Sequence, residues 1–158
     1  MDRLGAGLVA CVIIALPVIA VAQSPDACTL LSVAEIKAAL GRSDLGAPHP
    51  GRATSGGSSE CRFPGAGLGD VRIILGPADT KARADFDLKP EIYAMENKRF
   101  DRVANIADGA YYFDDTLEVR VGDRIVSLFL IRTSRTEPPA VVRTALTSLA
   151  KRATDRLR

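Results

Sequence analysis

The sequence predicts an α+β domain in which an antiparallel β-sheet of about five strands is packed by N-terminal and C-terminal helices. Two observations lead to this prediction. Residues 110–131 read as strands joined by very short turns, which is typical of antiparallel pairing. Residues 32–40 and 138–158 repeat apolar side chains at helical spacing on either side of the strand-rich part of the chain.

Residues 1–22 are predicted to be a signal peptide. Arg3 precedes an apolar run over residues 8–22, and Ala20-Val21-Ala22 has the Ala-x-Ala form that signal peptidase accepts. The run is short for a membrane span, which needs about 20 residues. We therefore expect an exported protein, periplasmic or secreted, with a single mature domain over residues 23–158. An uncleaved anchor is the alternative, and it would place the domain at a membrane.

The cysteines agree with export. Removal of the signal leaves Cys28 and Cys61, an even number in an oxidising compartment. A disulfide between them would close a loop of about 33 residues and stabilise the fold by roughly 3–4 kcal/mol. A redox-active or metal-binding pair is the alternative, but the CxxC spacing and a nearby His are missing.

A short helix is predicted over residues 32–40. Ser32 and Glu35 have the spacing of a capping box, Leu31 and Ile36 stand at the positions of a hydrophobic staple, and Gly41 suits the C-terminal cap. Because so short a helix is unstable alone, we expect it to lie on the sheet with Cys28 fixing its leading end.

Residues 42–59 are rich in Gly, Pro and Ser and are predicted to form a flexible surface loop. The loop contains the only histidine, His49, which we interpret as an incidental polar residue. Residues 60–63 and 71–75 are predicted strands. The Gly-rich run between them lacks the GxGxxG spacing and precedes a strand, so it is a hairpin loop and not a phosphate site.

A second helix is predicted from Thr80 to about Leu88, capped by Asp79. Pro90 is expected to interrupt this helix. Residues 91–97 would then resume as one or two turns, placing Ile92 and Met95 inward.

Gly122-Asp123 is predicted to close a β-hairpin, because Gly at the first position accepts the positive φ of a type II′ turn. The turn sets the register, with Leu117 opposite Leu128 and Val119 opposite Val126. One face of the hairpin is then dry: Leu117, Val119, Val126, Leu128 and Leu130. The other face is mixed: Glu118, Arg120, Ile125, Ser127 and Phe129.

The last helix is predicted to begin at Pro138-Pro139, since Pro is tolerated in a first turn. Its apolar stripe, expected to cover the dry face of the sheet, consists of Val142, Ala145, Leu146, Leu149, Ala153 and Leu157. Its opposite side is basic: Arg143, Lys151, Arg152, Arg156 and Arg158.

The chain resembles a loose class of small exported bacterial domains of unknown function, many of them lipoproteins. The resemblance is carried by the capped opening at residues 26–40, the second cysteine in residues 60–63, the turn at residues 106–111 and the terminal amphipathic helix. It implies a PsbP-type α/β/α sandwich and brings no catalytic residues with it. The chain departs from the lipoprotein members, because most of its apolar run follows Cys11, the only residue in a lipobox-like context.

Composition excludes several kinds of partner and chemistry. The net charge of +2 is too small to indicate a nucleic-acid partner. A single histidine excludes the common catalytic triads and most zinc sites, and we expect no cofactor or metal. The only acidic group worth weighing is Asp101, Asp108, Asp114, Asp115 and Glu118. Its aspartates fall mostly at predicted turns, where Asp is favoured for backbone reasons alone.

Three functions follow from this reading. The first is a non-catalytic exported module that binds a protein or small ligand through Arg120, Ile125 and Phe129, or through the 42–59 loop. The second is an envelope-surface protein whose basic C-terminal helix binds anionic lipid or polysaccharide in a salt-sensitive manner. The third is an enzyme with Asp114 and Asp115 in a concave pocket. We prefer the first function, because it requires the fewest special properties of the residues concerned.

Overall fold

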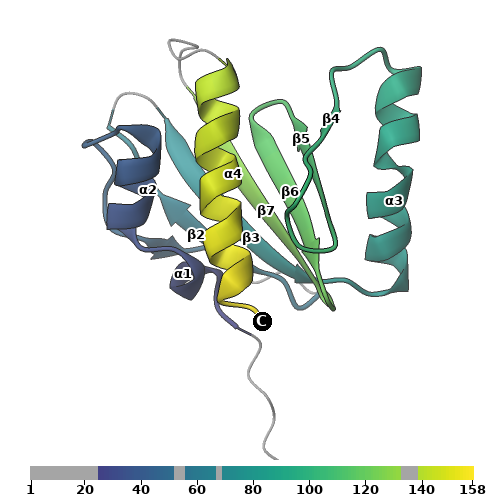
Figure 1. The fold of residues 1–158 in the computed structure, drawn as a ribbon. Coiled ribbons are helices and arrows are strands. Elements are labelled where there is room, and N and C mark those ends of the chain that lie inside the picture. The colour runs from purple at the N-terminus through teal and green to yellow at the C-terminus, as the bar shows by residue number, and fades with distance from the viewer. Residues whose placement is uncertain (1–24, 52–55, 67–68, 133–138) are drawn as a thin grey trace, which may run out of the picture.

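The computed structural model of the chain describes residues 25–51, 56–66, 69–132 and 139–158. They form one antiparallel sheet with helices on both faces (Figure 1). The helices are α1 (Ala27–Leu30), α2 (Val33–Leu40), α3 (Thr80–Met95) and α4 (Pro139–Asp155). The strands are β1 (His49–Pro50), β2 (Ser59–Phe63), β3 (Asp70–Pro77), β4 (Asp101–Arg102), β5 (Gly109–Phe113), β6 (Thr116–Val121) and β7 (Arg124–Ile131). The predicted α+β class and antiparallel pairing are confirmed.

The sheet contains seven strands, not about five, in the order β1-β2-β3-β7-β6-β5-β4. The two additional strands, β1 and β4, are two residues long and lie at opposite edges. Two residues show no readable alternation of apolar and polar side chains, so sequence patterning cannot find such strands. β1 lies within residues 42–59, which were predicted to be a loop, and pairs with β2 through His49 opposite Arg62.

The central hairpin has the predicted register. Leu117 is the Cα partner of Leu128, and Val119 is the partner of Val126. Gly122 has φ 56°, the left-handed value that a type II′ turn requires at its first position. The turn before β6 is made by Asp114 and Asp115, with φ 42° and 58°, values that Asp tolerates better than most residues.

The dry face of the sheet is covered by α1, α2 and α4 (Figure 1). Five of the six residues of the predicted apolar stripe are buried there, with Leu146 and Leu149 fully inaccessible to solvent. The sixth, Leu157, follows the end of α4 and is partly buried. The five predicted dry-face residues of β6 and β7 are all buried. Cys28 of α1 and Cys61 of β2 form the predicted disulfide, with their Cα atoms 4.9 Å apart. The bond therefore ties the first helix directly to the sheet.

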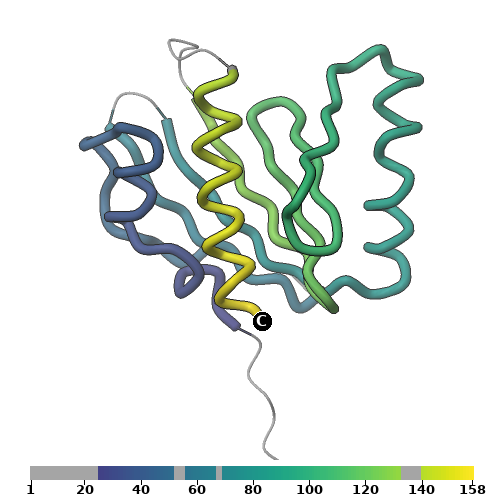
Figure 2. The backbone as a smooth tube through the Cα atoms, viewed as in Figure 1, coloured from purple at the N-terminus to yellow at the C-terminus, as the bar shows by residue number. Residues whose placement is uncertain are grey.

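The C-terminal end of α4 closes onto the beginning of the domain, and Figure 2 shows the two ends of the described chain side by side. The capping box of Ser32 and Glu35 is present. Glu35 also receives hydrogen bonds from Arg156, at 2.7 Å for the closer pair of atoms, and Arg152 lies 3.5 Å away. The Arg156 guanidinium in addition donates to the carbonyl of Leu30. One carboxylate thus connects α2 to α4.

This arrangement predicts a pH dependence of stability. Hydrogen bonds from Arg156, and then from the backbone N–H of Ser32, lower the pKa of Glu35 from 4.5 to about 2. Because the folded-state pKa is depressed, the stabilisation is fully present above pH 4.5 and is lost as pH falls towards 2. Glu35→Gln keeps the capping geometry. We expect it to lower the free energy of unfolding by about 1 kcal/mol at pH 7 and by almost nothing at pH 2. Urea unfolding at both pH values measures the difference.

Arg156→Gln supplies the control, because it removes the main partner and leaves Glu35 in place. The double variant Glu35→Gln/Arg156→Gln should lose less than the sum of the two single variants. Additive losses, or an equal cost of Glu35→Gln at both pH values, would show that the pair does not couple.

α3 is one continuous helix, so the predicted interruption at Pro90 is wrong. Proline removes one helical hydrogen bond, and a cost of about 3 kcal/mol is usual. The helix persists because Phe86 and Tyr93, one turn before and after Pro90, both pack on aromatic rings of the sheet side. Because the helix continues without a break, Ile92 and Met95 point outward, contrary to the prediction, with 41% and 76% of their surface exposed.

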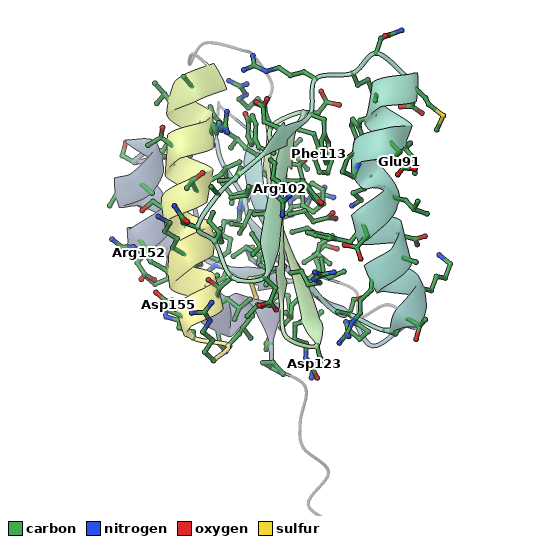
Figure 3. The ribbon with its side chains drawn as sticks, turned by 45° about the vertical axis from the view of Figure 1, so that its right-hand side comes forward. Glu91, Arg102, Phe113, Asp123, Arg152 and Asp155 are labelled. Carbon is green, nitrogen blue, oxygen red and sulfur yellow. A yellow bond between two sulfur atoms is a disulfide. The ribbon has the colours of Figure 1, made fainter. Side chains whose placement is uncertain are left out.

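α3 is the helix of the second face, and Figure 3 shows it on the opposite side of the sheet from α4. An aromatic cluster attaches it to β5, with Phe113 between the sheet and the helix: Phe86, Tyr93, Phe100, Tyr111 and Phe113. Two ion pairs attach it to β6, Lys89 with Glu118 and Asp87 with Arg120. These contacts all lie on the β4-β5-β6 half of the sheet, and none of them involves a residue of β2, β3 or β7.

Candidate functional site

The half of the second sheet face that α3 leaves uncovered is the candidate site. We call it the open face and define it as Glu60, Arg62, Arg72, Ile74, Ile125 and Phe129, on β2, β3 and β7. Side chains alternate across a strand, so these residues point away from the buried Cys61, Ile73 and Leu128 of the same strands. The open face therefore lies opposite α1, α2 and α4.

The open face is more apolar than a solvated sheet face normally is. Antiparallel strands with one wet face usually alternate apolar-in and polar-out. Here Ile74, Ile125 and Phe129 stand in the outward phase and are only partly buried, while Ile131 beside them is 42% exposed. These side chains remain in contact with water in the isolated domain, so covering them would be favourable.

Two arginines lie next to each other on this face. Arg62 and Arg72 are Cα partners on β2 and β3, an arrangement of like charges that is unfavourable without counter-charges. Arg62 Nε donates to Asp70 at 2.7 Å, whereas Arg72 Nε is 3.8 Å from Glu60. Arg72 Nε is buried and has no hydrogen-bond partner among the described residues. Arg72 is also the Cα partner of Phe129 on β7, so a guanidinium and an aromatic ring are neighbours on the open face.

The three residues predicted as a binding surface share this side of the sheet but not the same environment. Arg120 lies under α3, where its Nη1 donates to Asp87 at 2.9 Å and its guanidinium stacks on Phe86. Its role in the isolated domain is to hold α3. Ile125 and Phe129 lie on the open face, half-buried.

Sequence reasoning missed Arg72 and Ile74, the centre of the open face. The signal was present in residues 70–77, where Val71, Ile73 and Leu75 occupy the inward phase and Ile74 adds an apolar residue in the outward phase. Apolar side chains on both sides of adjacent strands indicate a sheet that is covered on both faces, either within the domain or by a partner. β3 and β7 both show this pattern.

The acidic residues are dispersed and individually engaged. Asp101 pairs with Arg143 at 3.1 Å, Asp108 accepts from the backbone N–H of Gly122 at 2.6 Å, and Glu118 pairs with Lys89. Asp114 is exposed at its turn. They therefore serve turns and ion pairs, as turn chemistry predicts.

Asp115 is the most constrained of these carboxylates. Arg132 donates to it through Nε at 2.9 Å, and the Tyr112 hydroxyl donates at 3.1 Å. Burial, and then the Asp115 carboxylate, raise the pKa of Tyr112 to about 12, so this phenol stays protonated. The arrangement fixes the turn before β6 and the end of β7 against each other.

The basic side of α4 is largely engaged within the chain. Arg152 and Arg156 contact Glu35, and Arg143 contacts Asp101 and stacks on the Tyr112 ring. These pairings reduce the charge available to an anionic lipid or polysaccharide. Binding through this helix stays a prediction, with Lys151 and Arg158 exposed at its end.

His49 is exposed on the edge strand β1. No cluster of three or more His, Cys, Asp or Glu side chains suited to a metal ion occurs in the described part of the chain. Within the same ranges, no helix is long and apolar enough to cross a bilayer. The predicted signal peptide, residues 1–22, lies outside the described residues.

No family model matches the chain, and neither a curated protein nor a solved structure proved significantly similar to it.

Proposed function

We propose that the chain is an exported, non-catalytic binding module whose open face docks a protein of the cell envelope. The disulfide between Cys28 and Cys61 suits an oxidising, exported environment. The sequence supports export through the signal-like residues 1–22. The resemblance to small exported bacterial domains agrees with an accessory role.

One observation carries the choice of surface. α3 covers only half of its sheet face and leaves Ile74, Ile125 and Phe129 partly exposed beside Arg62 and Arg72. Aromatic and Arg side chains are enriched at protein interfaces, and a contiguous apolar centre with a charged rim is the usual anatomy. An extended sheet face suits a protein surface better than a small molecule, which prefers a concave site.

The chemistry of the open face also constrains the partner. Arg62 and Arg72 are neighbours in register, and 50% and 38% of their side chains are exposed. A partner that offers a carboxylate or carbonyl oxygen beside an apolar side chain would pair with a guanidinium and cover Phe129 in one contact. Charge-assisted hydrogen bonds of this kind are about twice as strong as neutral ones.

Site-specific photo-crosslinking in the exporting cell tests the proposal. A photoreactive phenylalanine analogue in place of Phe129 is expected to trap a discrete envelope protein, and cell fractionation should recover the adduct outside the cytoplasm. Arg72→Glu in the same chain is expected to reduce the adduct at least tenfold, because it reverses the charge that the partner meets.

The matched control carries the analogue at Met95, which is 76% exposed on the outer side of α3. A protein adduct at position 129 and not at position 95 supports docking on the open face. Equal adducts at both positions, or an adduct at 129 that Arg72→Glu leaves intact, would refute it.

A further inference from the structure

A groove runs between α2 and α4 on the face of the sheet opposite the open face. It has a volume of about 500 Å³, within the range of small-ligand sites. Small and aliphatic side chains form most of its lining: Ala39, Ala140, Val141, Thr144, Ala145 and Ser148. Val141 in this lining is 53% exposed, so the groove offers an apolar side chain to a ligand.

The groove adjoins a narrow inner crevice. Val141 and Ala145 line both spaces, and the crevice continues to Leu130 and Val142 of the core. Two guanidiniums also line the crevice, those of Arg42 and Arg132, whose side chains are 4% and 5% exposed. The groove and the crevice are therefore built from α2, α4 and β7, and the two cationic side chains line the crevice.

Arg42 is fixed by several hydrogen bonds, and one of its nitrogen atoms has no acceptor among the described residues. Its Nε and Nη2 donate to the Asp44 carboxylate at 2.8 and 2.7 Å, and Nη2 also donates to the Gly69 carbonyl. Its Nη1 is buried and has no hydrogen-bond partner among the described residues. A buried donor without an acceptor costs about 1–3 kcal/mol, so an acceptor supplied from the crevice would be stabilising.

The same crevice meets the beginning of α4. Val141 and Val142 belong to the first turn of this helix, where backbone N–H groups give a partial positive charge. Arg42 and the helix terminus thus favour the same kind of group, an anion. The groove outside them favours a thin apolar body.

We propose that the groove binds a single-chain aliphatic carboxylate, that is, a fatty acid. Its acyl chain lies along Ala39, Val141 and Ala145, and its carboxylate lies where the groove meets the crevice. The crevice has about 10 Å³, room for a single oxygen atom, and that oxygen accepts the hydrogen bond of Arg42 Nη1. Asp44 keeps its two bonds to Nε and Nη2, so binding adds an acceptor without breaking the existing ion pair. This site is separate from the open face, and neither proposal depends on the other.

Titration of the ¹⁵N-labelled, disulfide-bonded protein with laurate below its micelle concentration tests the site. We expect saturable amide shifts at Ala39, Val141, Thr144 and Ala145, with a dissociation constant in the micromolar range. Methyl laurate has the same chain without the charge and is expected to bind at least tenfold more weakly. Val141→Asp places a carboxylate where the groove meets the crevice and should weaken laurate binding by a similar factor.

Leu88→Asp is the matched control, because Leu88 is 48% exposed on α3, on the other side of the sheet. It should leave laurate binding unchanged. Absence of saturable shifts at the groove, equal binding of laurate and methyl laurate, or equal weakening by both aspartate variants would each overturn the proposal.

Discussion

Replacing Cys28 and Cys61 together by alanine is expected to lower the free energy of unfolding by about 4 kcal/mol. The bond spans 33 residues of sequence, and the chain-entropy relation gives about 3.7 kcal/mol for such a loop. Cys61 is fully buried, so its removal also leaves a small void in the core. The free energy of unfolding of a typical domain is only about 5–15 kcal/mol, so this loss is a large part of the stability.

Urea unfolding of three samples measures the effect: the oxidised protein, the reduced protein and the Cys28→Ala/Cys61→Ala variant. The reduced protein and the variant should have similar midpoints, both well below that of the oxidised protein. Alanine in place of serine avoids burying a hydroxyl at position 61. Equal stability of the oxidised and reduced proteins would mean that the bond contributes nothing to the fold.

Leu146→Ala is the second change with a large expected effect. It should lower the free energy of unfolding by about 3–4 kcal/mol. Leu146 is fully buried on α4, which packs on β6 and β7 where Leu117 and Leu128 are likewise inaccessible. Truncation removes the transfer free energy of the side chain and leaves a cavity that rigid neighbours fill only in part. The predicted loss is measurable as a lowered urea midpoint with an unchanged slope.

Leu88→Ala provides the comparison, because the same substitution on the exposed side of α3 should change stability by less than about 0.5 kcal/mol. Similar losses at the two positions would contradict the assignment of the core to the α4 side of the sheet.

The parts of the fold that local chemistry determines were predictable from the sequence. The register of the β6–β7 hairpin depends on Gly122, and the start of α2 depends on Ser32 and Glu35. The apolar repeat in α4 identifies the helix that covers the dry face. Each of these elements carries its signal within a few residues.

The rest depends on contacts distant in sequence. α3 continues through Pro90 because rings of β5 receive Phe86 and Tyr93, and no local pattern reveals those rings. The half coverage of the second face, and with it the open face, follows from where α3 lies. Arg42 likewise reads as a loop residue until the fold places it beside α4 and Gly69.

The two shortest strands have a consequence for how the protein meets other chains. β1 and β4 form the two edges of the sheet, each with two residues, and Pro50 of β1 has no N–H to offer. Long unpaired edges act as templates for strand addition and amyloid-like growth, and short edges with Pro or charged residues suppress both. Asp101 and Arg102 supply the charges on β4. A concentrated solution of the folded protein should therefore resist edge-to-edge polymerisation, and association has to proceed through a face.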